Sequence, residues 1–185
     1  MKETGVIEKK TLKERALLNS AYDLFVKKGI NKTVISEITE NAGVAKGTFY
    51  LYFTDKQDIS KKLKIRLSKK IVKEACHKSL ENSPEIYEEF LQGVIVYIYD
   101  YFKINRDELE ILGKSLSLCL SDSEFSDKLA ALVLSKFGWE NDLNKDLFLL
   151  IEALNGIMYS NIMQGRIKDW EVEEIISIIL KKYVQ

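Results

Sequence analysis

Residues 33–56 read TVISEITENAGVAKGTFYLYFTDK, and this stretch decides the fold. After Thr33, a suitable N-cap, three apolar residues fall on one face of a short helix: Ile35, Ile38 and Ala42. Gly43 then supplies the permissive backbone that a sharp turn needs, and a second short helix is predicted over 45–53. Two short helices joined by such a turn form the helix-turn-helix pattern, which places its second helix in the major groove of DNA.

Helical patterns continue on both sides of this stretch. Before it, a helix is predicted over 9–28, and Gly29 should end it. After it, Asp55 can cap a long helix with a strongly basic outer face. Ser83 and Pro84 suit the N-cap and first position of the next helix. That helix should reach about residue 102, and the remaining helices are predicted over 106–120, 123–137, 144–164 and 169–183. The sequence therefore predicts an all-α fold.

The distribution of charge supports a nucleic-acid partner for the first part of the chain. The formal net charge of the whole chain is zero, which says nothing about partners. Residues 1–75, however, contain 17 basic and 9 acidic residues, a net charge of +8, and the remainder carries −8. A basic segment joined to an acidic one indicates that the first binds a polyanion and the second does not.

The helix-turn-helix stretch resembles the TetR family of transcriptional regulators. The likeness rests on Thr33 to Ile38, Ala42 to Tyr50, Tyr52, Phe53, Asp55 and Lys56, and it covers about the first third of the chain. The resemblance implies a three-helix DNA-binding domain over 1–55, a connecting helix over 56–75, and a helical ligand-binding and dimerisation domain over 76–185. It also implies a repressor that a small effector releases from a near-palindromic operator in double-stranded DNA.

Within residues 33–56, eight residues are predicted to contact DNA: Thr33, Ser36, Lys46, Gly47, Thr48, Tyr50, Tyr52 and Lys56. Lys46 and Lys56 stand at helix starts, where charge and free amides can both face phosphates. Gly47 lets the backbone approach DNA closely, and Thr48 can offer a hydroxyl and a methyl to a base edge. The family pattern puts the counterparts of both tyrosines on the DNA side. Ser36 is small, so base readout from its helix should be weak.

The resemblance also directs attention to the second part of the chain. Dimerisation through the last two helices should use two apolar seams, represented by Leu147, Leu150, Leu154, Ile157, Ile175, Ile176 and Ile179. An effector pocket should lie between the middle helices, lined by aromatics: Phe90, Tyr97, Tyr101, Phe125 and Tyr159. Between residues 76 and 159 the chain has one histidine, His77, and one arginine, Arg106, so a lipophilic, aromatic or antibiotic-like cationic effector is expected rather than a strongly anionic one.

Other function classes fit the sequence less well. There is no glycine-rich phosphate loop, and the single histidine excludes a histidine-based triad or metal cluster, so neither an enzyme nor a cofactor or metal is expected. Cys76 and Cys119 should be reduced core residues. No apolar run could span a bilayer, which predicts a cytoplasmic protein without membrane contact. An all-helical protein-interaction scaffold remains the alternative, and it predicts no salt-dependent DNA binding.

Overall fold

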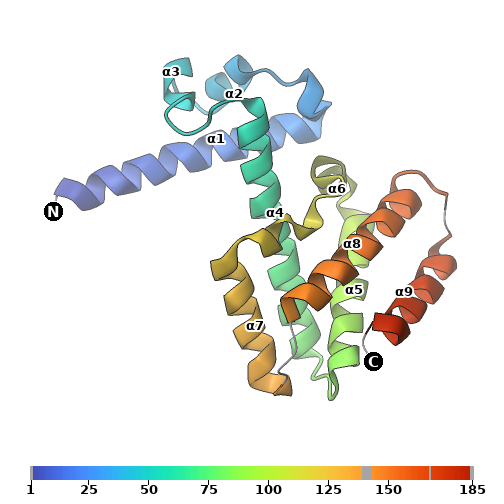
Figure 1. Cartoon of the computed structure of the whole chain (residues 1–185). Helices are drawn as coiled ribbons and strands as arrows, with labels where there is room; N and C mark the ends of the chain where they lie inside the picture. Colours follow the sequence, from blue (N-terminus) through green and yellow to red (C-terminus); the bar gives the residue numbers. More distant parts are fainter. Residues whose placement is uncertain (1, 139–142, 167, 184–185) are drawn as a thin grey trace. The chain divides into compact units, whose positions relative to one another are not determined.

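The structure is a computed structural model that describes residues 2–138, 143–166 and 168–183. Every regular element in these ranges is a helix (Figure 1), which confirms the all-α prediction. The elements are α1 Lys2–Lys32, α2 Ile35–Asn41, α3 Lys46–Phe49, α4 Lys56–Glu81, α5 Tyr87–Ile104, α6 Arg106–Leu112, the short 3₁₀ helix η1 Leu116–Ser121, α7 Ser123–Phe137, α8 Leu143–Ile162 and α9 Asp169–Tyr183. In the described part, no helix is both long and apolar enough to cross a membrane.

The chain divides into two compact units, Met1–Lys64 and Ile65–Gln185, called unit 1 and unit 2 below. The division falls inside α4, which is one continuous helix. Unit 1 therefore contains the helix-turn-helix stretch and the first turns of α4, and unit 2 contains the larger helical part.

The core of unit 1 joins its short helices to the two long ones. Its fully or almost fully buried apolar side chains are Leu17, Ala21, Phe25, Ile38, Phe49, Phe53, Ile59 and Leu63. The Ser20 hydroxyl adds a buried hydrogen bond from α1 to the carbonyl oxygen of Ile38 in α2, at 2.7 Å. Because α2 and α3 are too short to be stable alone, this shared core holds them in place.

In unit 2, α8 packs against α5, α9 and η1, and α5 also contacts α9 and α6. One approach between helices is especially close: a Cβ built on Gly93 of α5 would lie only 2.4 Å from the Ser79 hydroxyl oxygen of α4. That hydroxyl donates a hydrogen bond of 2.7 Å to the carbonyl oxygen of Phe90. Both Cys76 and Cys119 are buried and free, as predicted.

Several predicted helix boundaries are confirmed and others are wrong. The bounds of α7 and α9 agree with the predictions, and the backbone of α1 leaves helical geometry at Gly29 (φ 81°), although α1 starts earlier than predicted and resumes to Lys32. The predicted helix over 106–120 is divided at Gly113 (φ 57°) into α6 and η1. Ser83 does not cap a helix, because its φ of 54° lies in the left-handed region, and α5 starts only at Tyr87.

Candidate nucleic-acid interface

The second helix of the helix-turn-helix, α3, is held by a single buried aromatic side chain. Phe49 is completely buried, and its ring lies 5.4 Å from that of Phe53. The residues around Phe49 in sequence face outward: Lys46 and Gly47 are exposed, and Tyr50 is 54% exposed. The core of unit 1 therefore fixes α3 by one face and leaves the opposite face to meet another molecule.

The start of α2 is organised differently from the sequence prediction. Thr33 is not the N-cap and is fully buried, with its hydroxyl donating to the carbonyl oxygen of Gly29 at 2.9 Å. The N-cap is Val34, whose N–H donates to the Glu37 carboxylate at 3.0 Å. Lys28 forms a salt bridge with the same carboxylate, and these two partners lower the pKa of Glu37 below its ordinary value. Thr33 thus supports the turn from inside and offers no surface to DNA.

Lys56 also has a different role from the predicted one. Its ammonium donates hydrogen bonds to the carbonyl oxygens of Asn31, at 3.1 Å, and Thr33, at 2.9 Å. The ammonium that was predicted to contact phosphate is therefore bound to the backbone at the end of α1 and directly after it. Asp55 does cap α4 as predicted, since its carboxylate accepts the Asp58 N–H at 2.9 Å. Together these bonds fix the start of α4 against the helix-turn-helix.

The remaining predicted contacts lie at the surface of the helix-turn-helix. Ser36 on α2 is exposed, and Thr48 and Tyr52 are half-buried. Because α2 and α3 pack against each other, Ser36 and Thr48 lie on neighbouring helices, and Tyr52 follows α3 in a turn. Leu51 was missed by the sequence reasoning: it is 75% exposed and directly follows Tyr50. An exposed leucine beside an exposed tyrosine can contact a thymine methyl group or a sugar.

The comparisons with known proteins agree with this geometry. Residues 17–63 match the profile "Bacterial regulatory proteins, tetR family". Over these residues the chain is similar to the DNA-binding domain of the TetR family. This is the family that the helix-turn-helix residues predict.

Three relatives illustrate how far the likeness extends. Over 44 residues, the chain is 46% identical to the "Uncharacterized HTH-type transcriptional regulator YvdT" of Bacillus subtilis. This stretch covers 24% of the chain and 23% of that protein. Over 53 residues, the chain is 36% identical to the "Fatty acid metabolism regulator protein" of Bacillus subtilis. This stretch covers 29% of the chain and 27% of that protein. The matched stretches thus span about a quarter of these curated relatives.

A solved TetR-family transcriptional regulator from Streptomyces coelicolor matches 95% of this chain and 99% of its own, with a TM-score of 0.70 and 14% identity. At that identity the likeness shows the fold, including the larger helical domain. The relatives are transcriptional regulators, which agrees with the expectation that the protein is not an enzyme. Among the described residues, no group of His, Cys, Asp or Glu side chains is placed to hold a metal ion.

None of the five aromatic residues predicted to line an effector pocket is among the lining residues of the apolar cavity described below. Tyr97 and Tyr101 stack with ring centroids 6.2 Å apart, and the Tyr101 hydroxyl donates to Glu108 at 2.7 Å. Partial burial and a hydrogen bond with Glu74 raise the pKa of Tyr97 to about 12. The other three lie in different surroundings: Phe90 packs with Tyr87 and Phe137, Phe125 lies 5.7 Å from the Lys69 ammonium, and Tyr159 is half-buried on α8.

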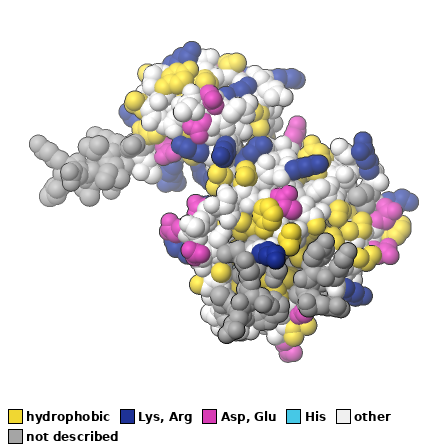
Figure 2. Space-filling view, in the orientation of Figure 1, with side chains coloured by type: hydrophobic (Ala, Val, Ile, Leu, Met, Phe, Trp, Pro, Cys, Tyr) yellow, Lys and Arg dark blue, Asp and Glu magenta, His cyan; other side chains and the backbone are white. Residues whose placement is uncertain are grey.

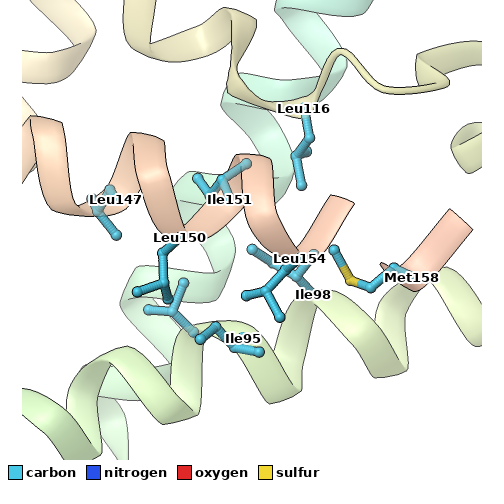
Figure 3. A pocket seen from close by; sticks show the side chains of 9 residues that line it. Ile95, Ile98, Leu116, Leu147, Leu150, Ile151, Leu154 and Met158 are labelled. Carbon is cyan, nitrogen blue, oxygen red and sulfur yellow. The ribbon is translucent and has the colours of Figure 1, made fainter. Parts of the chain in front are cut away.

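A different set of residues surrounds an apolar cavity in unit 2. Figure 3 shows these side chains pointing toward one another from α5, η1 and α8. They are Val94, Ile95, Ile98, Leu116, Leu147, Leu150, Ile151, Leu154 and Met158. The void between them is about 10 Å³, which is about the room that one water molecule needs. Three of these residues are also among the predicted dimer contacts.

Most residues of the predicted dimer seam are buried inside unit 2. Leu147, Leu150, Leu154 and Ile176 are each at most 4% exposed, because they pack inside unit 2. Ile157, Ile175 and Ile179 are half-buried. Periodic apolar residues had indicated that one face of each helix is covered, and the chain's own core covers most of it. Other large apolar side chains of α8 and α9 are exposed: Phe148, Leu149, Trp170 and Ile178.

Proposed function

We propose that the protein is a sequence-specific DNA-binding transcriptional regulator, in which unit 1 binds DNA and unit 2 binds an effector and dimerises. The observation that supports this most directly is the outward face of α3, with Lys46, Gly47 and Tyr50 exposed around the buried anchor Phe49. Lys46 positions the protein on phosphates, and Thr48 and Tyr50 contact base edges or backbone. On the visible face of unit 1, basic side chains outnumber acidic ones (Figure 2), as contact with DNA requires.

Dimerisation follows from the geometry of such recognition. One short helix contacts only a few base pairs, so useful affinity needs two half-sites about one helical turn apart, related by the symmetry of a dimer. Figure 2 shows hydrophobic side chains gathered on the visible face of unit 2. We assign the contact between protomers to the outer faces of α8 and α9, where Phe148, Leu149, Trp170 and Ile178 are 42–59% exposed. This assignment replaces the buried members of the predicted seam.

For the effector, the apolar cavity between α5 and α8 supports a lipophilic molecule. The void is too small for such a ligand, so binding has to separate the two helices and thereby change unit 2. Asn155 lies on α8 one residue after the cavity residue Leu154, is 1% exposed, and has no hydrogen-bond partner for either side-chain polar atom in the described part of the chain. A buried amide without partners costs about 1–3 kcal/mol. An apolar ligand with one hydrogen-bonding group would relieve that cost.

Release from DNA would then run through α4, the one helix that begins in unit 1 and ends in unit 2. A displacement of α4 by the effector changes the separation of the two recognition helices in the dimer. Because coupling between two binding sites is reciprocal, the effector weakens operator binding and the operator weakens effector binding by the same factor. The protein acts in this scheme as a repressor in the cytoplasm.

The test is binding of the purified full chain to fragments of its genomic neighbourhood at several salt concentrations, with a scrambled duplex as competitor. Tight, competitor-resistant binding with a steep salt slope is expected. Lys46→Ala should weaken binding and reduce the slope by about 1 for each protomer. Lys114→Ala, which removes an exposed lysine of unit 2, is the matched control and should bind like the wild type.

Gly47→Ala separates DNA contact from folding. A Cβ at Gly47 would meet no atom of the protein within 4 Å. The variant should therefore fold with unchanged or slightly higher thermal stability, because alanine is favoured over glycine in helices. Its affinity for the operator should fall, since the added methyl group obstructs close approach to DNA.

The wild type also decides between the two function classes. Equal affinity of the wild type for the operator fragment and the scrambled duplex would favour the protein-interaction scaffold over a sequence-specific regulator.

A further inference from the structure

The turn that follows α3 carries Tyr50 and Tyr52, two of the predicted DNA contacts. It spans residues 50–52, directly after the last residue of α3, Phe49. The N–H groups of Tyr52 and Phe53 both donate to the carbonyl oxygen of Phe49, each at 3.0 Å. These local bonds shape the turn, and a contact from α4 fixes its position.

Lys62 of α4 makes that contact. Its ammonium donates a hydrogen bond of 2.9 Å to the carbonyl oxygen of Tyr52. The same ammonium lies 4.7 Å from the centroid of the Phe53 ring and 3.9 Å from the Glu14 carboxylate of α1. The bond to the Tyr52 carbonyl oxygen is the principal one, because the side chains of Lys62 and Glu14 are each more than one third exposed and such ion pairs contribute little. One lysine therefore joins α1, the turn and α4 within unit 1.

The structure gives the charge of Lys62 an internal use. A lysine on the basic outer face of α4 would ordinarily be assigned to a phosphate contact. Here its ammonium is bound within unit 1, as is the ammonium of Lys56. Lys56 binds backbone that precedes α2, and Lys62 binds backbone in the turn after α3. Two lysines of α4 thus hold the helix-turn-helix at both of its ends.

We propose that Lys62 is a positioning residue for DNA recognition, which holds the Tyr52 carbonyl oxygen and so fixes the turn that presents Tyr50 and Tyr52, without touching DNA itself. This inference rests on the proposed DNA-binding function. A turn that is ordered before binding loses little further freedom in the complex, so its order contributes to operator affinity. Without Lys62 that order has to be supplied on binding. The cost is about the value of one hydrogen bond, which corresponds to about a 2- to 10-fold loss of affinity per protomer.

The experiment compares the wild type with Lys62→Met, which keeps an unbranched apolar side chain near Phe53 and removes the ammonium. Lys62→Arg keeps a cationic donor for the same carbonyl oxygen. Lys61→Met is the matched control, because it removes the same charge from an exposed neighbour on α4. Affinities for the operator fragment and for the scrambled duplex are measured from 50 to 300 mM salt. The temperature is one at which circular dichroism shows every variant to be folded.

Lys62→Met should bind the operator about 2- to 10-fold more weakly per protomer, while its affinity for the scrambled duplex and its salt slope stay close to those of the wild type. Without DNA, hydrogen exchange at the Tyr52 and Phe53 amides should be faster by a similar factor, because the turn opens more readily. Lys62→Arg should restore most of both properties. Lys61→Met should keep the wild-type ratio of the two affinities and the wild-type exchange rates.

Three results would overturn the proposal. An equal loss of affinity for both duplexes, with a salt slope reduced by about 1 per protomer, would make Lys62 a phosphate contact. Unchanged operator affinity of Lys62→Met, whatever its stability, would make Lys62 a structural residue only. Both of these results would leave the proposed function intact. A wild type that binds the two duplexes equally would overturn the proposed function and this inference with it.

Discussion

The contact between Gly93 and Ser79 should make a substitution that usually stabilises a helix destabilise this one. Gly93 lies inside α5, where alanine would ordinarily be favoured over glycine by about 0.5–1 kcal/mol. Here the added Cβ would lie 2.4 Å from the Ser79 hydroxyl oxygen and 3.1 Å from the Ser79 Cβ. Rotation of the hydroxyl would break its bond to Phe90 and would leave the second contact in place. We therefore predict that Gly93→Ala lowers the free energy of unfolding.

The size of the effect follows from two opposing contributions. Overpacking of a well-packed region costs about 1–3 kcal/mol. Subtracting the helix preference of alanine leaves a loss of about 0–2.5 kcal/mol, with about 1 kcal/mol as the central value. In a Ser79→Gly background both close atoms are absent. The same Gly93→Ala change should then raise the free energy of unfolding by about 0.5–1 kcal/mol.

Urea denaturation at fixed protomer concentration measures all four proteins of this double-mutant cycle. Gly156→Ala in α8 is the matched control, because a Cβ at Gly156 would meet no protein atom within 4 Å. The free energy of unfolding of that variant should be about 0.5–1 kcal/mol higher than that of the wild type, per protomer. The reasoning is refuted if Gly93→Ala stabilises the protein as much as Gly156→Ala, or has the same effect with and without Ser79.

Three further predictions concern other features of the chain. Phe49→Ala should lower the free energy of unfolding of unit 1 by about 3–5 kcal/mol, because it empties the core under α3; a loss below 1 kcal/mol by urea denaturation would contradict this. Burial raises the pKa of the Cys76 and Cys119 thiols to about 12, so neither should react with Ellman's reagent at pH 8 until unfolding, and fast labelling of the folded protein would argue against the packing. Lys28 and the Val34 N–H lower the pKa of Glu37 below its ordinary value of 4.5. The ionised carboxylate therefore stabilises the fold above pH 4.5, and this stabilisation is lost as the pH falls through the lowered pKa. Acid titration of the stability of Glu37→Gln should lack this component, and a titration like that of the wild type would contradict the assignment.

The helix-turn-helix could be predicted from sequence because local patterns specify it. The spacing of Ile35, Ile38 and Ala42, the turn at Gly43 and the cap at Asp55 are all readable within a few residues. The role of Lys56 could not be predicted in this way, because the carbonyl oxygens that bind it belong to residues more than 20 positions earlier. Only the folded chain brings those atoms together.

The seam on α8 shows a second limit of pattern reasoning. Leu147, Leu150 and Leu154 recur at helical spacing, which indicates that one face of the helix is covered. Periodicity does not say whether the cover is the same chain or a second copy, and here it is α5 and its neighbours. Asn155 gave no signal either, because an asparagine beside a leucine seam is read as a solvent-facing residue unless its burial is known.

The anchoring of α3 by Phe49 alone has a consequence for how this protein can evolve. The position of α3 depends on its one fully buried side chain, whereas the residues that would meet DNA contribute little to the core. Mutations at Lys46, Thr48, Tyr50 or Leu51 can therefore accumulate without loss of the folded state. After a gene duplication, two copies could come to control different genes by exchanging only these surface residues, and the same freedom makes α3 a suitable site for laboratory selection of new operators.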